Sequence, residues 1–155
     1  MTSIALGKSL PAFEAAATSG NTISAKGLKG KKCVLYFYPR DNTPGCTCEG
    51  EDFRDHFPAF KKLGVEIIGI SRDSLTSHEK FRQKFSFPFE LLADEDEQLC
   101  QLFQVMKMKN MYGKQVRGIE RSTFLFDEKG ILRQEWRKVK VEGHVEEVLA
   151  AVKSL

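Results

Sequence analysis

The sequence lacks any long apolar run and any sustained run of charge of one sign. No stretch of the 155 residues approaches the roughly 18 consecutive apolar residues of a membrane-spanning helix. The 24 Lys and Arg are interleaved with 21 Asp and Glu, so the net charge is only +3. A nucleic-acid or anionic-membrane surface needs a concentrated basic stripe, and this pattern therefore argues against both partners.

The sequence also shows no signal-peptide pattern, no flexible linker and no internal repeat, and it contains only four cysteines. The first residues, MTSIALGKSLPAF, lack the basic start and apolar stretch of a signal peptide, so we expect a cytoplasmic protein. In that reducing compartment, cysteines are expected to be core thiols, metal ligands or reactive groups rather than disulfides. With no linker to divide them, residues 1–155 are predicted to form one domain.

The order of the hydrophobic patterns predicts an α/β fold. Residues 33–39 and 65–71 form β-branched and aromatic runs, typical of strands buried on both faces. Between them, residues 49–63 place apolar side chains at spacings of three and four, which predicts a helix. A strand, a helix and a strand in this order favour two parallel strands joined by a right-handed crossover.

The second half of the chain predicts an antiparallel addition to this unit. We expect a helix capped at Ser74 or Ser77, a short FPFELLAD segment and a third helix near residues 95–103. ERSTFLFDEKGILRQEWR predicts a hairpin, and residues 143–155 predict a closing helix. Together these elements favour a thioredoxin-like fold, in which a central mixed β-sheet is flanked by helices. The irregular MKMKNMYGKQVRG is expected to be a loop, or alternatively a flexible wall over the site.

The segment TPGCTC follows the first strand and presents two cysteines. Pro39 is expected to end the strand, because proline cannot donate the next hydrogen bond of the ladder. Residues 43–45 then form a turn into a helix that begins near Cys46. Unpaired N–H groups and the helix macrodipole favour an anion there, so the thiolate of Cys46 is favoured as a nucleophile. The hydroxyl of Thr43 is expected within reach of the sulfur or of a bound oxygen.

The spacing of Pro39, Thr43 and Cys46 in PRDNTPGC resembles the Pro-x-x-x-Thr-x-x-Cys signature of peroxiredoxins. The segments LYFYPRDNTPGCTCEGEDFRD, GVEIIGISRDS and GIERSTFLFDEKG, in this order, resemble the bacterioferritin-comigratory or peroxiredoxin Q subfamily. The resemblance covers nearly the whole chain. It implies an antioxidant thiol peroxidase that reduces hydrogen peroxide and organic hydroperoxides without a cofactor.

The resemblance also implies residue roles. Cys46 is the peroxidatic cysteine, whose thiolate attacks one peroxide oxygen and becomes a sulfenic acid. Thr43 orients the peroxide, and Pro39 shields the pocket from water. Arg121, in GIERSTF, supports the thiolate and polarises the peroxide. A guanidinium suits this role, because it stabilises charge on the sulfur and on the leaving oxygen without losing its proton.

The residues that would complete the cycle depart from the subfamily pattern. Many relatives carry a resolving cysteine five residues after the peroxidatic one, where this chain has Glu51, and SHEKFRQKF carries none. Cys48 is near, but residues two apart on a helix point about 200° away from each other, so the first turn would have to unwind. Cys100 and Cys33 lie in apolar patterns and are expected to be core thiols, Cys100 being the less favoured resolving candidate.

The favoured interpretation is a one-cysteine cycle, in which thioredoxin, glutaredoxin or glutathione reduces the sulfenic acid. Cys48 as resolving cysteine comes second. No interface pattern stands out, and relatives are often monomers, so we expect a monomer. The twelve Phe predict hydrophobic walls for the site, which makes alkyl or lipid hydroperoxides candidate substrates beside hydrogen peroxide.

Three other functions are less favoured. A thioredoxin-like dithiol/disulfide oxidoreductase could use Cys46 and Cys48, but such enzymes usually have two residues between the cysteines, not one. A metal site with His56 lacks the two spaced ligand pairs of structural zinc, so no metal is expected. A binding protein with a silenced site would not need the complete set of Pro39, Thr43, Cys46 and Arg121.

The three histidines are expected to be surface or helix-capping residues. His56 lies ten residues past Cys46 on the predicted helix, which is about 15 Å along its axis and too far for a catalytic base. His78 and His144 lie in polar stretches near predicted helix starts.

Overall fold

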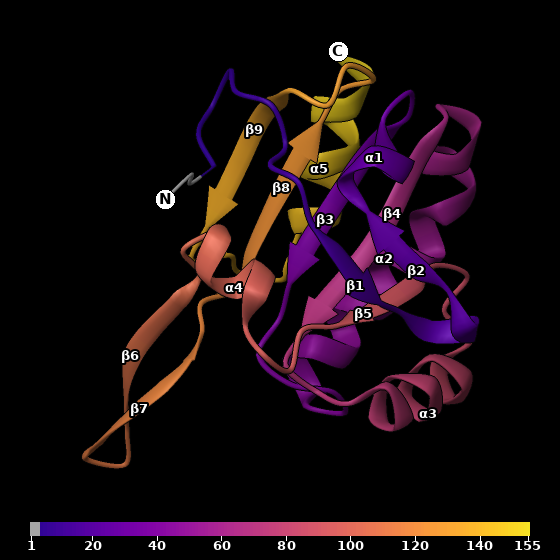
Figure 1. Ribbon diagram of the computed structural model, residues 1–155. Helices are drawn as coiled ribbons and strands as arrows, with labels where there is room; N and C mark the ends of the chain where they lie inside the picture. Colours follow the sequence, from indigo (N-terminus) through magenta and orange to yellow (C-terminus); the bar gives the residue numbers. More distant parts are fainter. Residues whose placement is uncertain (1–3) are drawn as a thin grey trace.

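The computed structural model describes residues 4–155, in which a five-stranded mixed sheet has helices on both faces (Figure 1). The strand order is β5-β4-β3-β8-β9. The parallel half comprises β3 (Lys32–Phe37), β4 (Val65–Ser71) and β5 (Glu90–Ala93). The antiparallel half adds β8 (Ser122–Phe126) to β3, and β9 (Leu132–Arg137) to β8. The thioredoxin-like mixed sheet predicted from the sequence is therefore confirmed.

Four helices accompany this sheet: α2 (Pro44–Lys62), α3 (Leu75–Phe85), α4 (Gln98–Leu102) and α5 (His144–Lys153). Of the two predicted caps for α3, the structure uses Ser74, whose hydroxyl accepts a hydrogen bond from the backbone N–H of Ser77. None of the helices among residues 4–155 combines the length and the apolar character required to cross a membrane.

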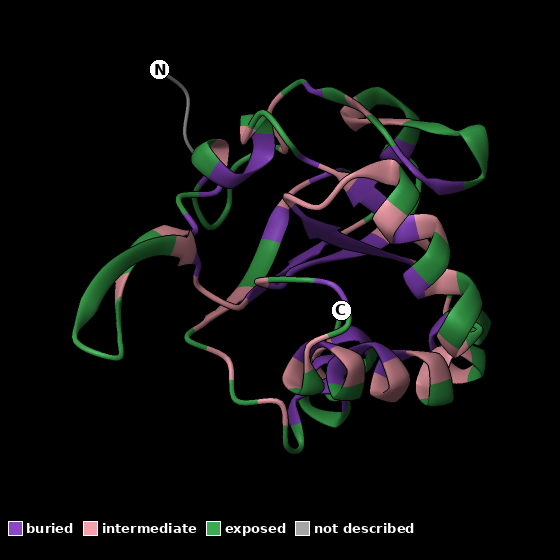
Figure 2. Cartoon of the chain, turned by 90° about the horizontal axis from the view of Figure 1, so that it is seen from below, coloured by how far each residue is buried: buried purple, intermediate pink, exposed green. Residues whose placement is uncertain are grey.

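The core lies on both faces of the sheet, because successive side chains of β3 point to opposite faces. Val34 and Tyr36 face the aromatic side chains of α2, whereas Leu35 and Phe37 face α4 and the N-terminal segment. Figure 2 shows the strands of the sheet largely buried inside their helical cover. The β3 run is thus buried on both faces, as its continuous apolar pattern predicts.

Several short elements precede β3 and were not predicted. A small antiparallel pair comprises β1 (Glu14–Ala16) and β2 (Thr22–Ser24), with a 3-10 turn (Thr18–Gly20) between them and α1 (Ala25–Leu28) after them. Strands of three residues are too short to show a hydrophobic period, and the pattern therefore contained no signal for them.

The prediction of a loop in MKMKNMYGKQVRG was wrong. β6 (Met106–Met111) and β7 (Lys114–Ile119) form an antiparallel hairpin that projects from the body of the molecule (Figures 1 and 2). Tyr112 and Gly113 both have positive φ angles, 53° and 79°, as a two-residue hairpin turn requires. Met108 and Met111 are exposed on this hairpin, and the alternative of a wall over the site stays a prediction.

Candidate active site

The first turn of α2 places Cys46 just beyond the carboxyl end of β3, as predicted. The helix begins at Pro44, in the first helical position, where the missing N–H of proline costs no hydrogen bond. Thr43 is the N-cap residue and has extended backbone angles, with φ −85° and ψ 153°. The prediction that residues 43–45 form a turn was therefore wrong by two residues, because Pro44 and Gly45 are already helical.

Cys46 and Arg121 meet at this helix end, although they are 75 residues apart in the sequence. Arg121 lies between β7 and β8, and its Nη2 donates to Sγ of Cys46 at 3.4 Å. Cys46 is only 2% exposed, so this contact lies inside the protein. A guanidinium directed at a buried sulfur stabilises the negative form of that sulfur.

Arg121 has a second acceptor in Glu49, which the sequence analysis missed. Its Nη1 donates to Oε1 of Glu49 at 2.6 Å, and Glu49 is fully buried. Burial raises the pKa of Glu49 to about 7, although the charge of Arg121 opposes this rise. The carboxyl group of Glu49 therefore changes charge near neutral pH, and the guanidinium is shared between this carboxyl group and the sulfur of Cys46.

A pattern in the sequence could have identified Glu49. It lies three residues after Cys46, and therefore on the same side of α2, and four residues before the buried Phe53. A carboxylate within the apolar face of a helix must find a cation when it is buried. The partner could not be named from the sequence, because Arg121 belongs to a distant segment.

Gly45 makes room for the arginine. A Cβ atom built on Gly45 would lie 3.1 Å from Nη2 of Arg121, closer than a normal contact. The sequence assigned Gly45 to a turn, but the residue is helical, and it is this close approach that favours glycine here.

The other two predicted site residues lie on the loop before α2. The hydroxyl of Thr43 donates to the carbonyl oxygen of Arg40 at 2.9 Å, rather than to the sulfur of Cys46 as expected. Pro39 is half-buried and lines a cavity of about 410 Å³. The structure thus brings Cys46 and Arg121 into direct contact. Thr43 and Pro39 are connected to Cys46 through the backbone of the loop. The roles of Thr43 and Pro39 toward a peroxide stay predictions.

The remaining cysteines differ sharply in environment. Cys48 is exposed, whereas Cys46 is buried in the same helical turn, so the two side chains point to different sides of α2. Cys100 is buried, as predicted, and burial together with Asp94 raises its pKa. Cys33 is also buried, which raises its pKa to about 12, and it lines a cavity of about 330 Å³ at the opposite end of β3. Cys33 and Cys100 are therefore held as neutral thiols.

Two of the three histidine predictions were wrong. His56 is half-buried and contacts the carbonyl oxygen of Asp52 within its own helix, as a surface residue can. His78 and His144, by contrast, are buried. Their polar sequence neighbours suggested a surface, but each ring reaches polar groups inside the fold, and His144 meets the hydroxyl of Thr123 at 2.7 Å.

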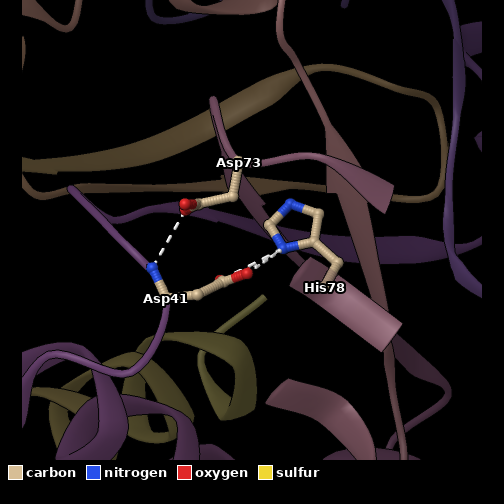
Figure 3. Close-up of side chains that lie close together, drawn as sticks. All are labelled: Asp41, Asp73 and His78. Atoms are coloured by element: carbon tan, nitrogen blue, oxygen red, sulfur yellow. Dashed lines mark hydrogen bonds and ion pairs between the residues drawn. The ribbon is translucent and has the colours of Figure 1, made fainter. Parts of the chain in front are cut away.

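The buried Asp41 and His78 and the half-buried Asp73 form a polar cluster in which three potential metal-ligand atoms lie within 4.8 Å of one another (Figure 3). Hydrogen bonds account for their closeness. Nδ1 of His78 lies 2.8 Å from Oδ2 of Asp41, and Oδ2 of Asp73 accepts from the backbone N–H of Asp41 at 2.9 Å. The predicted alternative of a metal held by Cys46 and Cys48 is disfavoured, because one thiol is buried and the other is exposed.

Comparisons with known proteins agree on one family. The model of the AhpC/TSA family matches residues 6–135. The chain is 49% identical over 147 residues to a putative peroxiredoxin bcp of Coxiella burnetii, covering 95% of this chain and 97% of the relative. It is 48% identical over 152 residues to peroxiredoxin Bcp of Bacillus subtilis, covering 98% and 97%.

Solved structures give the same result. Peroxiredoxin Q of Xanthomonas campestris superposes with a TM-score of 0.87 at 51% identity, covering 92% of this chain and 90% of that one. A PrxQ variant of Xylella fastidiosa superposes with a TM-score of 0.93 at 39% identity, covering 99% and 98%. A further structure of the Xanthomonas campestris protein addresses its alkyl peroxide reduction activity.

Substitution of Gly45 should disturb the contact between Arg121 and Cys46. We expect Gly45→Ala to slow the oxidation of Cys46 by hydrogen peroxide about tenfold, because the new methyl group displaces a hydrogen-bond donor. Stopped-flow measurement of the second-order rate constant tests this. Gly118→Ala is the control, since a Cβ atom there lies 3.9 Å from Lys109, an ordinary contact. Equal rates in the two variants would contradict the role of Gly45.

Glu49 should make the stability of the fold depend on pH. The folded state keeps the proton of Glu49 up to about pH 7, whereas the unfolded chain releases it near the ordinary value of 4.5. The folded state therefore binds more protons between these values, and the free energy of unfolding falls as the pH rises through them, by up to about 3 kcal/mol. Urea unfolding at pH 5 and pH 7.5 should show a smaller fall in the free energy of unfolding for Glu49→Gln than for the wild type. An identical fall in both proteins would refute this titration.

Proposed function

The chain belongs to the AhpC/TSA family, as a thiol peroxidase of the peroxiredoxin Bcp type, and on this basis we propose that Cys46 is its peroxidatic residue. The thiolate of Cys46 attacks one oxygen of a hydroperoxide. A sulfur–oxygen bond forms, the oxygen–oxygen bond breaks, and the other oxygen takes up a proton and leaves as water or an alcohol. The sulfur is oxidised to a sulfenic acid, and the peroxide is reduced.

The hydrogen bond from Arg121 to Cys46 carries this proposal. Its positive charge favours the thiolate before attack and stabilises the negative charge that develops on the leaving oxygen. Glu49 holds the guanidinium through its other nitrogen, so Arg121 does not need to reorient during the reaction. In this proposal the hydroxyl of Thr43 orients the peroxide, and Pro39 excludes water from the loop side.

The surroundings of Cys46 favour hydroperoxides with an organic group as well as hydrogen peroxide. Cys46 belongs to a buried cluster that includes Tyr36, Tyr38 and Phe53. Such apolar walls suit an alkyl chain better than a charged substrate. The alkyl peroxide reduction activity studied in the Xanthomonas campestris relative supports the same substrate class here.

An outside thiol completes the cycle in this proposal. One thiol attacks the sulfenic sulfur and releases water, and a second thiol then frees Cys46 and leaves the reductant as a disulfide. Thioredoxin, glutaredoxin and glutathione are all candidates for the reductant. Cys48 is the alternative first attacker, and it is disfavoured because it points to a different side of the helix. We further propose a monomeric, cytoplasmic enzyme.

Substitution of the cysteines tests which sulfur reacts. Cys46→Ser is expected to abolish hydroperoxide reduction, because the serine hydroxyl is not a nucleophile at neutral pH. Cys33→Ser and Cys100→Ser are the matched controls and should keep most of the turnover, since both thiols are buried away from Arg121. A peroxide-consumption assay with saturating reductant measures this. Turnover retained by Cys46→Ser would end the peroxidase assignment of this residue.

The state of the sulfur after one turnover separates the two cycles. We expect intact mass spectrometry after one equivalent of peroxide to show a sulfenic acid on Cys46 that a dimedone trap captures. Because Cys48 lies on another side of α2, the same adduct should form at the same rate in Cys48→Ser. Loss of two hydrogen atoms, mapped to a disulfide between Cys46 and Cys48, would instead establish the two-cysteine cycle.

A further inference from the structure

We propose that Asp41 and His78 form a buried ion pair that positions the loop carrying Pro39 and Thr43, and that both are positioning residues for the attack by Cys46. The ion pair is argued from the hydrogen-bond geometry, whereas its effect on the reaction rests on the proposed function. No role follows for these two residues from the resemblance to peroxiredoxins, and His78 was expected to be a surface or helix-capping residue.

The ring of His78 has an acceptor at each nitrogen. Nδ1 lies 2.8 Å and 3.1 Å from the two carboxyl oxygens of Asp41, and Nε2 lies 3.0 Å from the backbone carbonyl oxygen of Leu92 (Figure 3 shows the Asp41 contact). A carbonyl oxygen only accepts hydrogen bonds, and so does a carboxylate. Nδ1 also lies 3.4 Å from the hydroxyl of Tyr38, but that hydroxyl donates to Asp41. Beside an ionised Asp41, both ring nitrogens donate, and in this proposal the buried His78 is a charged imidazolium.

Asp41 is surrounded by donors, which identifies it as the negative partner. The hydroxyl of Tyr38 donates to Oδ1 at 2.7 Å, and the hydroxyl of Ser77 donates to Oδ2 at 2.7 Å. Burial, and then the charge of Asp41, raises the pKa of Tyr38, so its hydroxyl stays protonated and available as a donor. A carboxylate that accepts three hydrogen bonds is stabilised in its charged form.

The pair holds the loop before α2 at its centre. Asp41 lies two residues after Pro39 and two residues before Thr43. Its side chain is tied to the first turns of α3 through Ser77 and His78, and its backbone N–H is tied to Asp73 at the end of β4. The loop is therefore fixed to the connection between β4 and α3. Because the chain continues from Asp41 through Thr43 into α2, the position of this loop also sets the position of the first turn that carries Cys46.

Loss of this anchor should disturb the chemistry more than the fold. A buried charge without its partner is costly, so the loop would leave its position to bring Asp41 into contact with water. Thr43 and the first turn of α2 would move with it, and the contact of 3.4 Å between Arg121 and Cys46 would lengthen. A displacement of about 1 Å by a remote substitution can slow a reaction about a hundredfold.

The protonation state of His78 can be tested without any assay of activity. In a long-range ¹H–¹⁵N correlation spectrum of the ¹⁵N-labelled chain at pH 7, His78 should show two protonated ring nitrogens. His144 is the internal control, because burial lowers its pKa to about 4 and it should show the neutral pattern. A neutral pattern at His78 would overturn the ion pair.

The positioning role is tested by comparing two electrophiles. For His78→Gln and Asp41→Asn, we expect the rate constant of Cys46 oxidation by hydrogen peroxide to fall roughly tenfold to a hundredfold. The alkylation rate of Cys46 by iodoacetamide should fall much less than the peroxide rate, since alkylation uses the thiolate but does not need Arg121 to stabilise a leaving oxygen. His144→Gln, which changes another buried histidine, should alter neither rate by more than about twofold.

A purely structural role would give a different result. The unfolding midpoint would fall while the folded enzyme kept its peroxide rate within twofold of the wild type, and this outcome would overturn the positioning role. Ser77→Ala, which removes a single donor to Asp41, provides a milder variant if His78→Gln does not fold, and it should slow the peroxide reaction about threefold. A wild-type chain inert toward peroxide would overturn the proposed function and the positioning role together, but not the ion pair.

Discussion

The arrangement of the site depends on one guanidinium that is shared between a sulfur and a buried carboxyl group. Arg121 reaches Cys46 with one nitrogen and Glu49 with the other, and both partners lie on the first two turns of α2. A cation buried at the end of a parallel strand needs acceptors of this kind, because it has lost most of its water. The start of α2 positions Cys46, Gly45 leaves room for the guanidinium, and Arg121 directly precedes β8, so all three features contribute to this contact.

A second pair, the proposed ion pair of Asp41 and His78, joins the loop before α2 to the start of α3. Arg121 with Glu49 fixes the helix side of the site, and Asp41 with His78 fixes the loop side. Each pair joins segments that are distant in the sequence, and the aromatic ring of Tyr38 packs near His78 in the second pair. Such pairs add little net stability compared with apolar packing, but they restrict the geometry, which is what a reaction between fixed atoms requires.

The sequence predicted those features that depend on local pattern. The continuous apolar run of β3 and the apolar stripe of α2 identified the βαβ unit, and the position of Cys46 at its helix start followed from it. The pairing of Arg121 with Glu49 could not be predicted, because the position of Glu49 on the apolar side of the helix shows only that it needs a cation, and that cation lies 72 residues away in the sequence. His78 was misplaced for the same reason, since its acceptors Asp41 and Leu92 come from two other segments. The hairpin of β6 and β7 was missed because its turn is Tyr-Gly rather than a familiar Asn-Gly pair.

If Cys46 is the peroxidatic residue, as proposed, its burial has a consequence for the timing of the cycle. Because Cys46 is only 2% exposed, another protein would reach its sulfur only after a local opening of the first turn of α2, and an oxidised sulfur would stay in the site until then. The free energy of that local opening therefore sets how long the oxidised sulfur stays in the site. A stable turn shelters the sulfenic acid from the reductant and leaves it longer beside any second peroxide, which would convert it irreversibly to the sulfinic form. The few hydrogen bonds at one helix end thus set a balance between turnover and self-inactivation.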